Sequence, residues 1–155
     1  MEELLKINDI RQVISVLFSE RIPYNKLLEL RIGSLDPAQP TVEIDMRDDL
    51  VGNFIHKTLH GGVTAAVLDV TGGLVAFLNL MEKLDELSRE EKFARFAKLG
   101  TIDLRIDYLR PGRGNHFVST GYILRTGNKV AVTRMELHNE QNTLIAVGTG
   151  AYTVS

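Results

Sequence analysis

The longest apolar stretch of the chain runs from Thr58 to Met81, and Asp69 is its only charged residue when histidine is neutral. Apolar or small residues surround the helical wheel, and a helix that is apolar all round is buried. We therefore predict a buried central helix that starts near Gly61 or Gly62. A buried carboxylate is costly unless it is paired, hydrogen-bonded or used in chemistry. Asp69 is accordingly a candidate site residue, with structural pairing as the competing interpretation.

The chain before this helix has two kinds of pattern. Apolar residues recur at helical spacing through residues 1–20, which predicts an amphipathic N-terminal helix that ends before Pro23. Short strands are expected at Leu27–Leu35 and Thr41–Met46. The polar segment Arg47–Lys57 is expected to be an irregular connection.

The segment after the central helix is rich in charge and keeps only a thin apolar stripe. Ser88 is followed three residues later by Glu91, which has the form of a capping box. We therefore predict a helical insertion at residues 82–98. It either packs as a solvated helix or covers a binding cleft as a flap, because long connections are often functional.

From Thr101 the period of the pattern changes to two, which is typical of half-buried strands. The predicted strands are Thr101–Tyr108, His116–Thr126, Lys129–His138 and Thr143–Val154. The turns between them look tight, so these four strands are expected to form an antiparallel meander. With the two early strands they give a sheet of about six, near the usual size. The predicted architecture is α+β, a curved sheet wrapped around the central helix, in a single domain of residues 1–155.

Composition and charge exclude several classes. The chain has no cysteine, so disulfides, thiolate metal sites and a cysteine nucleophile are excluded. Its net charge is −2 and its basic residues are dispersed, which argues against nucleic acid as a partner. The first residues lack the pattern of a signal peptide. The central apolar run contains an aspartate and four glycines, so we expect no membrane span and a cytoplasmic protein.

The start of the central helix offers a second candidate group. Free backbone N–H groups at Gly61 and Gly62 can bind a carbonyl oxygen or a developing oxyanion. The competing interpretation is that the glycines only permit close packing. Asp69 lies eight residues further on, which is about 12 Å along a helix. If both groups act on one atom, the aspartate must come from a second subunit.

Two histidines four residues apart, His56 and His60, raise the possibility of a metal site. Such a site needs a third ligand, and the sequence has no HExxH-type pattern. We therefore expect no metal. His60 is expected instead to form a hydrogen bond near the start of the helix.

An ordered set of residues resembles the signature of hot-dog-fold acyl-CoA thioesterases of the phenylacetic-acid-degradation type, within the 4-hydroxybenzoyl-CoA thioesterase superfamily. In that family an Asn precedes His-Gly-Gly, and an acid follows in the central helix. The next strand brings a Ser or Thr and ends in a Tyr-hydrophobic-Arg-Pro segment. The matching positions here are Asn53, His60-Gly61-Gly62, Asp69, Thr101 and Tyr108-Leu109-Arg110-Pro111-Gly112. The resemblance covers residues 25–154 and implies the hot-dog fold.

This resemblance implies hydrolysis of acyl-CoA to free acid and CoA, with no cofactor. An amide at the helix start and Asn53 would polarise the thioester carbonyl, and His56 is the alternative to Asn53. Asp69 from the second subunit would be a general base or a nucleophile. Thr101 would help to hold the attacking water.

The resemblance also implies how the substrate is held and how many copies assemble. His60 and His56 are candidate substrate-binding residues. Arg110 and Arg113 are candidates for the CoA phosphates, because guanidinium binds phosphate well. A merely solvated turn is the competing interpretation for both arginines. The expected assembly is a homodimer or a tetramer built from two dimers.

Two other functions stay open from the sequence. A hot-dog-fold dehydratase or hydratase acting on hydroxyacyl thioesters would need a histidine facing the acid, and none is apparent beside Asp69. A non-catalytic acyl-CoA binding module would hold Asp69 in a structural hydrogen bond. The thioesterase interpretation is the leading one.

Overall fold

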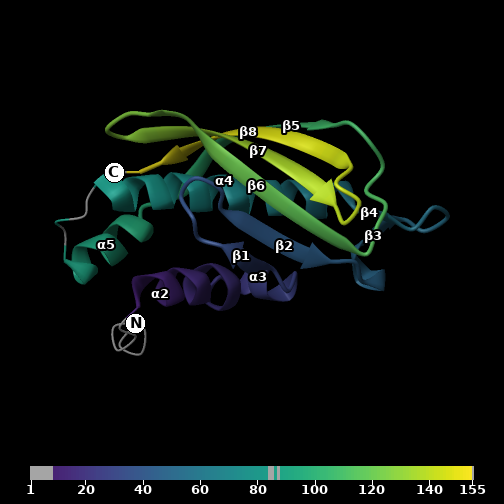
Figure 1. The fold of residues 1–155 in the computed structure, drawn as a ribbon, viewed down its shortest axis with the longest axis horizontal. Helices are drawn as coiled ribbons and strands as arrows, with labels where there is room; N and C mark the ends of the chain where they lie inside the picture. The colour runs from purple at the N-terminus through teal and green to yellow at the C-terminus, as the bar shows by residue number, and fades with distance from the viewer. Residues whose placement is uncertain (1–8, 84–85, 87, 155) are drawn as a thin grey trace.

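The computed structural model describes residues 9–83, 86 and 88–154. Predictions for residues 1–8, 84–85 and 87 fall outside the described residues. A curved sheet lies over the long helix α4 (Gly61–Lys83), and the helices of the N-terminal segment lie on the other side of α4 (Figure 1). The predicted helix wrapped by an antiparallel sheet is thus confirmed, and α4 begins at the first of the two expected glycines.

The main sheet has six antiparallel strands in the order β1-β2-β6-β7-β8-β5. Their bounds are β1 Arg31–Ser34, β2 Thr41–Asp45, β5 Gly100–Tyr108, β6 His116–Thr126, β7 Val130–Asn139 and β8 Leu144–Thr153. The predicted number of strands is confirmed. The order of the strands leaves β5 at one edge of the sheet, next to β8.

The prediction of a four-strand meander is wrong. Strands β6, β7 and β8 do form a meander, but β5 pairs with β8 and β6 pairs with β2. The connection from β5 to β6, residues 109–115, is too long for a tight hairpin and contains Pro111. It crosses the end of the sheet, which places the first strand after α4 on the outer edge.

The core forms between α4 and the concave face of the sheet. Val67, Leu68 and Leu74 of α4 are fully buried, and so is Phe117 of β6. Inside this core the Thr71 hydroxyl lies 2.7 Å from the Val67 carbonyl oxygen and 2.8 Å from the Ser119 hydroxyl. By length and composition α4 could cross a membrane, but 72% of its most apolar stretch is buried within the fold. It is the core helix of the domain.

The N-terminal segment differs from the single helix that was predicted. Helix α2 (Ile10–Val16) widens into a π-helix at Leu17–Arg21, and Pro23 starts a further helix, α3 (Pro23–Leu27). Proline suits the first turn of a helix because its missing N–H has no partner to lose there. Leu27 therefore belongs to a helix, and the predicted strand shrinks to β1.

Four short elements, two helical and two extended, complete the fold. The predicted capping box is confirmed, since Ser88 and Glu91 exchange both hydrogen bonds at the start of α5 (Arg89–Phe96). The segment expected to be irregular instead contains the 3-10 helix Asp48–Leu50 and a small hairpin. This hairpin is built from β3 (Val51–Asn53) and β4 (Thr58–Leu59) and leads into α4.

Candidate active site

Of the two glycine N–H groups at the start of α4, one is used and one is free. The Gly62 N–H donates to Nδ1 of His60 at 2.8 Å. This confirms the expected hydrogen bond of His60 near the helix start, and it places the proton of a neutral imidazole on Nε2. The Gly61 N–H has no partner among the described residues, as expected for the first residue of a helix. Gly61 is therefore the free donor at this end.

The segment after β5 holds the start of α4 in place. The Tyr108 hydroxyl donates to the Gly61 carbonyl at 2.8 Å, and the Leu59 N–H donates to the Gly112 carbonyl at 2.8 Å. A Cβ on Gly112 would lie 2.8 Å from the Leu59 Cβ, so only glycine permits this approach. The Tyr-Leu-Arg-Pro-Gly segment thus fixes the position of the first residue of α4 and of the strand before it.

Asn53 and His56 both lie in the β3–β4 hairpin. The Asn53 Oδ1 accepts hydrogen bonds from the backbone N–H groups of Ile55 and His56 at 3.0 and 3.1 Å. These bonds form the turn and leave the Asn53 amide nitrogen without a partner among the described residues. A Cβ on the neighbouring Gly52 would lie 2.7 Å from the Cα of His60, so the strand of Asn53 runs close beside His60. His56 lies in the exposed turn, which projects from the body of the molecule (Figure 1).

Asp69 is held by two hydroxyls. Thr101 Oγ1 donates to Asp69 Oδ1 at 2.9 Å, and the Tyr152 hydroxyl lies 3.2 Å from the same oxygen. The Tyr152 hydroxyl also lies 3.1 Å from the Asp69 carbonyl oxygen. Asp69 Oδ2 has no partner among the described residues. One carboxylate oxygen is fixed and the other is available for chemistry.

Tyr152 is buried in a slot formed by glycines. A Cβ on Gly72 would overlap the Tyr152 hydroxyl, and a Cβ on Gly150 would lie 2.6 Å from it. Burial, and after it the charge of Asp69, raises the pKa of the Tyr152 phenol. The phenol therefore stays protonated and acts as a donor to Asp69.

One chain does not bring Asp69 and Gly61 together. Asp69 and Thr101 line a hollow of about 270 Å³, whereas Gly61 and Tyr108 line another of about 340 Å³. The two hollows have no lining residue in common within the described ranges. The separation predicted from the rise of a helix is thus present in the structure.

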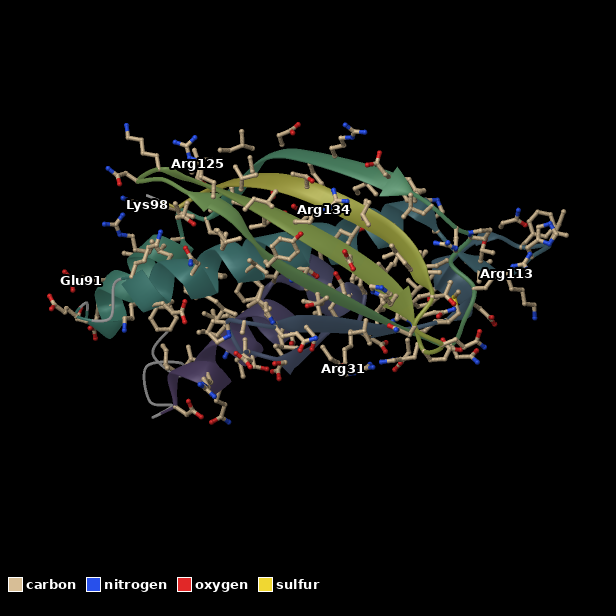
Figure 2. All side chains as sticks on the ribbon, turned by 45° about the horizontal axis from the view of Figure 1, so that its top comes forward. Arg31, Glu91, Lys98, Arg113, Arg125 and Arg134 are labelled. Carbon is tan, nitrogen blue, oxygen red and sulfur yellow. The ribbon has the colours of Figure 1, made fainter. Side chains whose placement is uncertain are left out.

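The two arginines are placed differently. Arg110 lines the hollow of Gly61, and its guanidinium donates to the Leu144 carbonyl at 3.0 Å. Arg113 is exposed, and Figure 2 shows it at the end of the molecule where the β3–β4 hairpin projects. No cluster of His, Asp and Glu suited to a metal ion occurs among the described residues.

Comparison with known proteins identifies the family. The sequence profile of the thioesterase superfamily matches residues 56–146, a range that holds His60, Gly61, Asp69 and Thr101. The chain belongs to the thioesterase superfamily. It is 40% identical to the medium/long-chain acyl-CoA thioesterase YigI of Salmonella typhimurium and 38% identical to that of Escherichia coli K12, over 99% of each chain.

A solved structure agrees with this assignment. A protein from Shewanella oneidensis, described as related to the thioesterase superfamily, is 50% identical and superposes with a TM-score of 0.90. The match covers 93% of this chain and 94% of that one. The resemblance to hot-dog thioesterases and the assignment as a thioester-hydrolysing enzyme are therefore confirmed.

Sequence reasoning missed Tyr152 in this thioesterase. Its position in the last strand gave no sign that it reaches Asp69, because the two residues are 83 apart in the chain. A partial signal was present in the adjacent glycines Gly72 and Gly73. Two glycines inside a helix are costly, and they indicate that another group must approach closely.

Proposed function

We propose that this thioesterase hydrolyses medium- to long-chain acyl-CoA at active sites shared by two copies of the chain. The observation that carries this proposal is the placement of the two reacting groups in separate hollows on one rigid helix. The acyl-CoA substrate class follows the YigI relatives, which match the chain from end to end. The cytoplasm is the proposed location, as the sequence predicts.

Strand β5 provides the means of bringing the groups together. Its outer edge pairs with no strand of the described chain. Thr101, at the start of β5, contacts Asp69, and Tyr108, at its end, contacts Gly61. If the β5 strands of two copies pair antiparallel about a two-fold axis, the start of each meets the end of the other. The Asp69 hollow of one copy then faces the Gly61 hollow of the other.

Exposed apolar side chains along this edge support the pairing. Ile102 and Tyr108 are each 55% exposed in a single chain, and Leu109 is 49% exposed. An uncovered edge strand with apolar side chains is a site of unwanted pairing, and a symmetric dimer covers it. A homodimer is thus the proposed unit, and a tetramer would require a second interface.

Within the shared site, each group has one task. The Gly61 N–H and the Asn53 amide nitrogen donate to the thioester oxygen as it gains negative charge. Asp69 Oδ2 either removes a proton from water, whose oxygen attacks the carbonyl carbon, or attacks that carbon itself. The C–S bond then breaks and the CoA thiolate takes up a proton. In the second route, water hydrolyses the resulting anhydride.

The remaining candidates are assigned to positioning and substrate binding. Thr101 holds Asp69 Oδ1 and lies beside the proposed position of the water. His60 fixes the first turn of α4 and presents Nε2–H to the substrate side. Arg110 and Arg113 are proposed to bind the CoA phosphates at the end of the molecule where the substrate enters, and His56 in the exposed hairpin adds a further contact to CoA.

Complementation between two inactive variants tests the shared site. Asp69→Asn removes the carboxylate charge, and Gly61→Pro removes the amide donor at a helix position that accepts proline. Each variant alone should lose at least about a hundredfold in kcat on acyl-CoA. When equal amounts of the two are unfolded and refolded together, about half of the dimers should contain one copy of each variant. One of the two sites in each such heterodimer is intact, so about a quarter of the wild-type activity should return.

The controls separate the alternatives. Refolding either variant alone should restore nothing. If the mixture stays inactive although dimers containing one copy of each variant form, each site lies within one chain and the shared site is wrong. If the wild type binds medium- to long-chain acyl-CoA tightly without releasing CoA, the proposed substrate class is wrong.

A further inference from the structure

The hollow beside Asp69 continues along an apolar face of α4. Ala66, Val70 and Gly73 line it, at the three- and four-residue spacing of neighbours on one helix face. Thr101 lines it together with Asp69. Apolar lining on both sides of the carboxylate suits a hydrocarbon chain attached to the reacting carbonyl.

The opposite wall of this hollow comes from the N-terminal segment. Phe18 in the π-helix, Ile22 just after it and Tyr24 in α3 all line the hollow. These residues lie outside residues 56–146, the part that matches the superfamily profile. Gly61, Asp69 and Thr101 lie inside that range, whereas this wall lies outside it, as Asn53 does.

A buried hydrogen bond fixes the wall. A π-helical bond to the Phe18 carbonyl would have to come from residue 23, which is proline and has no N–H. The side chain of Asn25 supplies the donor instead, with Nδ2 at 2.8 Å from the Phe18 oxygen. Asn25 is only 2% exposed, so this bond is shielded from water and holds Phe18 in one place.

Aromatic rings support Phe18 from behind. Its ring centroid lies 5.5 Å from that of Phe96 in α5 and 6.2 Å from that of Phe77 in α4. Phe77 and Phe96 contact each other at 5.4 Å. An alkyl chain that extends along α4 past Gly73 would therefore meet a ring that two others prevent from moving aside.

We propose that residues 17–25, which we name the N-terminal wall, set the length of acyl chain that this thioesterase accepts, with Phe18 as the stop. This proposal rests on the proposed acyl-CoA substrate and assigns its specificity to named residues. The hollow of about 270 Å³ is finite, so only acyl chains up to a limiting length can be buried in it. Longer chains would have to leave the hollow.

Binding of S-alkyl-CoA thioethers, from butyl to hexadecyl, measures the length directly and requires no hydrolysis. In the wild type, Kd should fall about fourfold for each added methylene while the chain is being buried. The fall should stop at the chain length at which the hollow is full. The chain length at which the fall stops is the quantity to compare between variants.

Two substitutions should move this length in opposite directions. A Cβ on Gly73 has ordinary contacts, with Leu99 and Tyr152 atoms at 3.8 Å, so Gly73→Val adds bulk in the hollow without a clash at Cβ. It should shorten the accepted chain by two or so carbons. Phe18→Leu removes part of the stop and should lengthen it. Phe96→Leu is the matched control, because Phe96 supports the same cluster without lining the hollow.

The outcomes are distinct. Opposite shifts in Gly73→Val and Phe18→Leu, with a smaller shift in Phe96→Leu, support the proposal that the N-terminal wall sets the accepted chain length. An unchanged length in both variants, with thermal unfolding confirming that they are folded, overturns it. A shift in Phe96→Leu larger than that in Phe18→Leu also overturns it, since Phe96 can act on the hollow only by holding Phe18 in place. Failure of hydrolysis would count against the proposed function alone, because the thioethers report binding.

Discussion

The hydroxyl of Tyr152 and the carboxylate of Asp69 lie 3.2 Å apart, although the two residues are 83 positions apart in the chain. Tyr152 also reaches the Asp69 backbone carbonyl at 3.1 Å, so it fixes both the backbone and the side chain of this residue. Because Oδ1 is held in this way, Oδ2 keeps a constant direction. We therefore propose that Tyr152 positions the Asp69 carboxylate for its proposed reaction.

Tyr152→Phe tests this role. Removing a hydrogen bond to a charged group costs about 1.5–3 kcal/mol, so kcat should fall by about tenfold or more. KM should change little, because the ring that lines the hollow stays in place. Steady-state kinetics on acyl-CoA measure both values. Tyr122→Phe, on the exposed outer face of β6, is the control. Equal kcat in both variants would show that the Tyr152 hydroxyl contributes only to stability.

The two glycines within α4 should respond oppositely to alanine. A Cβ on Gly72 would overlap the Tyr152 hydroxyl and lie 2.8 Å from Thr133 Oγ1, so Gly72→Ala should lower the free energy of unfolding by about 1–3 kcal/mol. At Gly73 the nearest atoms are 3.8 Å away, so Gly73→Ala should raise it by roughly 0.5–1 kcal/mol through helix propensity. Urea unfolding of both variants tests this, and equal losses would contradict the described slot.

Alkaline pH should destabilise the fold through Tyr152. Burial raises the pKa of its phenol in the folded state above the ordinary value of 10. The stabilisation is complete below pH 10 and is lost as the pH rises above it, because only the unfolded chain then releases the proton. The slope should approach about 1.4 kcal/mol per pH unit for this one group. Stability curves of wild type and Tyr152→Phe between pH 8 and 12 isolate it, and identical slopes would refute the assignment.

Asn25 should contribute more to the free energy of unfolding than an exposed polar residue of similar size. Asn25→Ala leaves the Phe18 carbonyl without its buried donor, which should cost about 1–3 kcal/mol in urea unfolding. Gln12→Ala, an exposed change in the same N-terminal region, should stay within about 0.5 kcal/mol of the wild type. A cost at Asn25 no larger than at Gln12 would mean that the Phe18 carbonyl finds another donor.

Much of the fold could be predicted because its strongest signals are local. The apolar run around Asp69 gave α4, strict alternation gave β5, and the Ser88–Glu91 spacing gave the start of α5. Strand order is not a local property. The predicted meander places β5 next to β6, but in the structure β5 pairs with β8. In the sequence, only the long connection through Pro111 distinguishes these two pairings, and no turn residue does.

The residues of the candidate site likewise fall into those that a local pattern predicts and those that only the packing of distant segments brings to the site. His60 and Gly61 are neighbours in sequence, so their pattern predicts the free N–H at the helix start. Thr101 was found through its family pattern, and the structure brings it to Asp69. Tyr152 and Phe18 reach the site through packing of distant segments, for which a single sequence carries no periodic signal. The widening of α2 into a π-helix is equally a product of tertiary packing and of Pro23.

The unpaired outer edge of β5 has a consequence for how the activity of such an enzyme depends on protein concentration. If two copies share the active site as we propose, each copy carries half of the reacting groups, and an isolated chain is not a weaker catalyst but an incomplete one. Dilution then removes activity by mass action, and substrate that bridges two copies opposes the dissociation. Specific activity should fall as the protein is diluted, and turnover numbers hold only at the protein concentration at which they were taken.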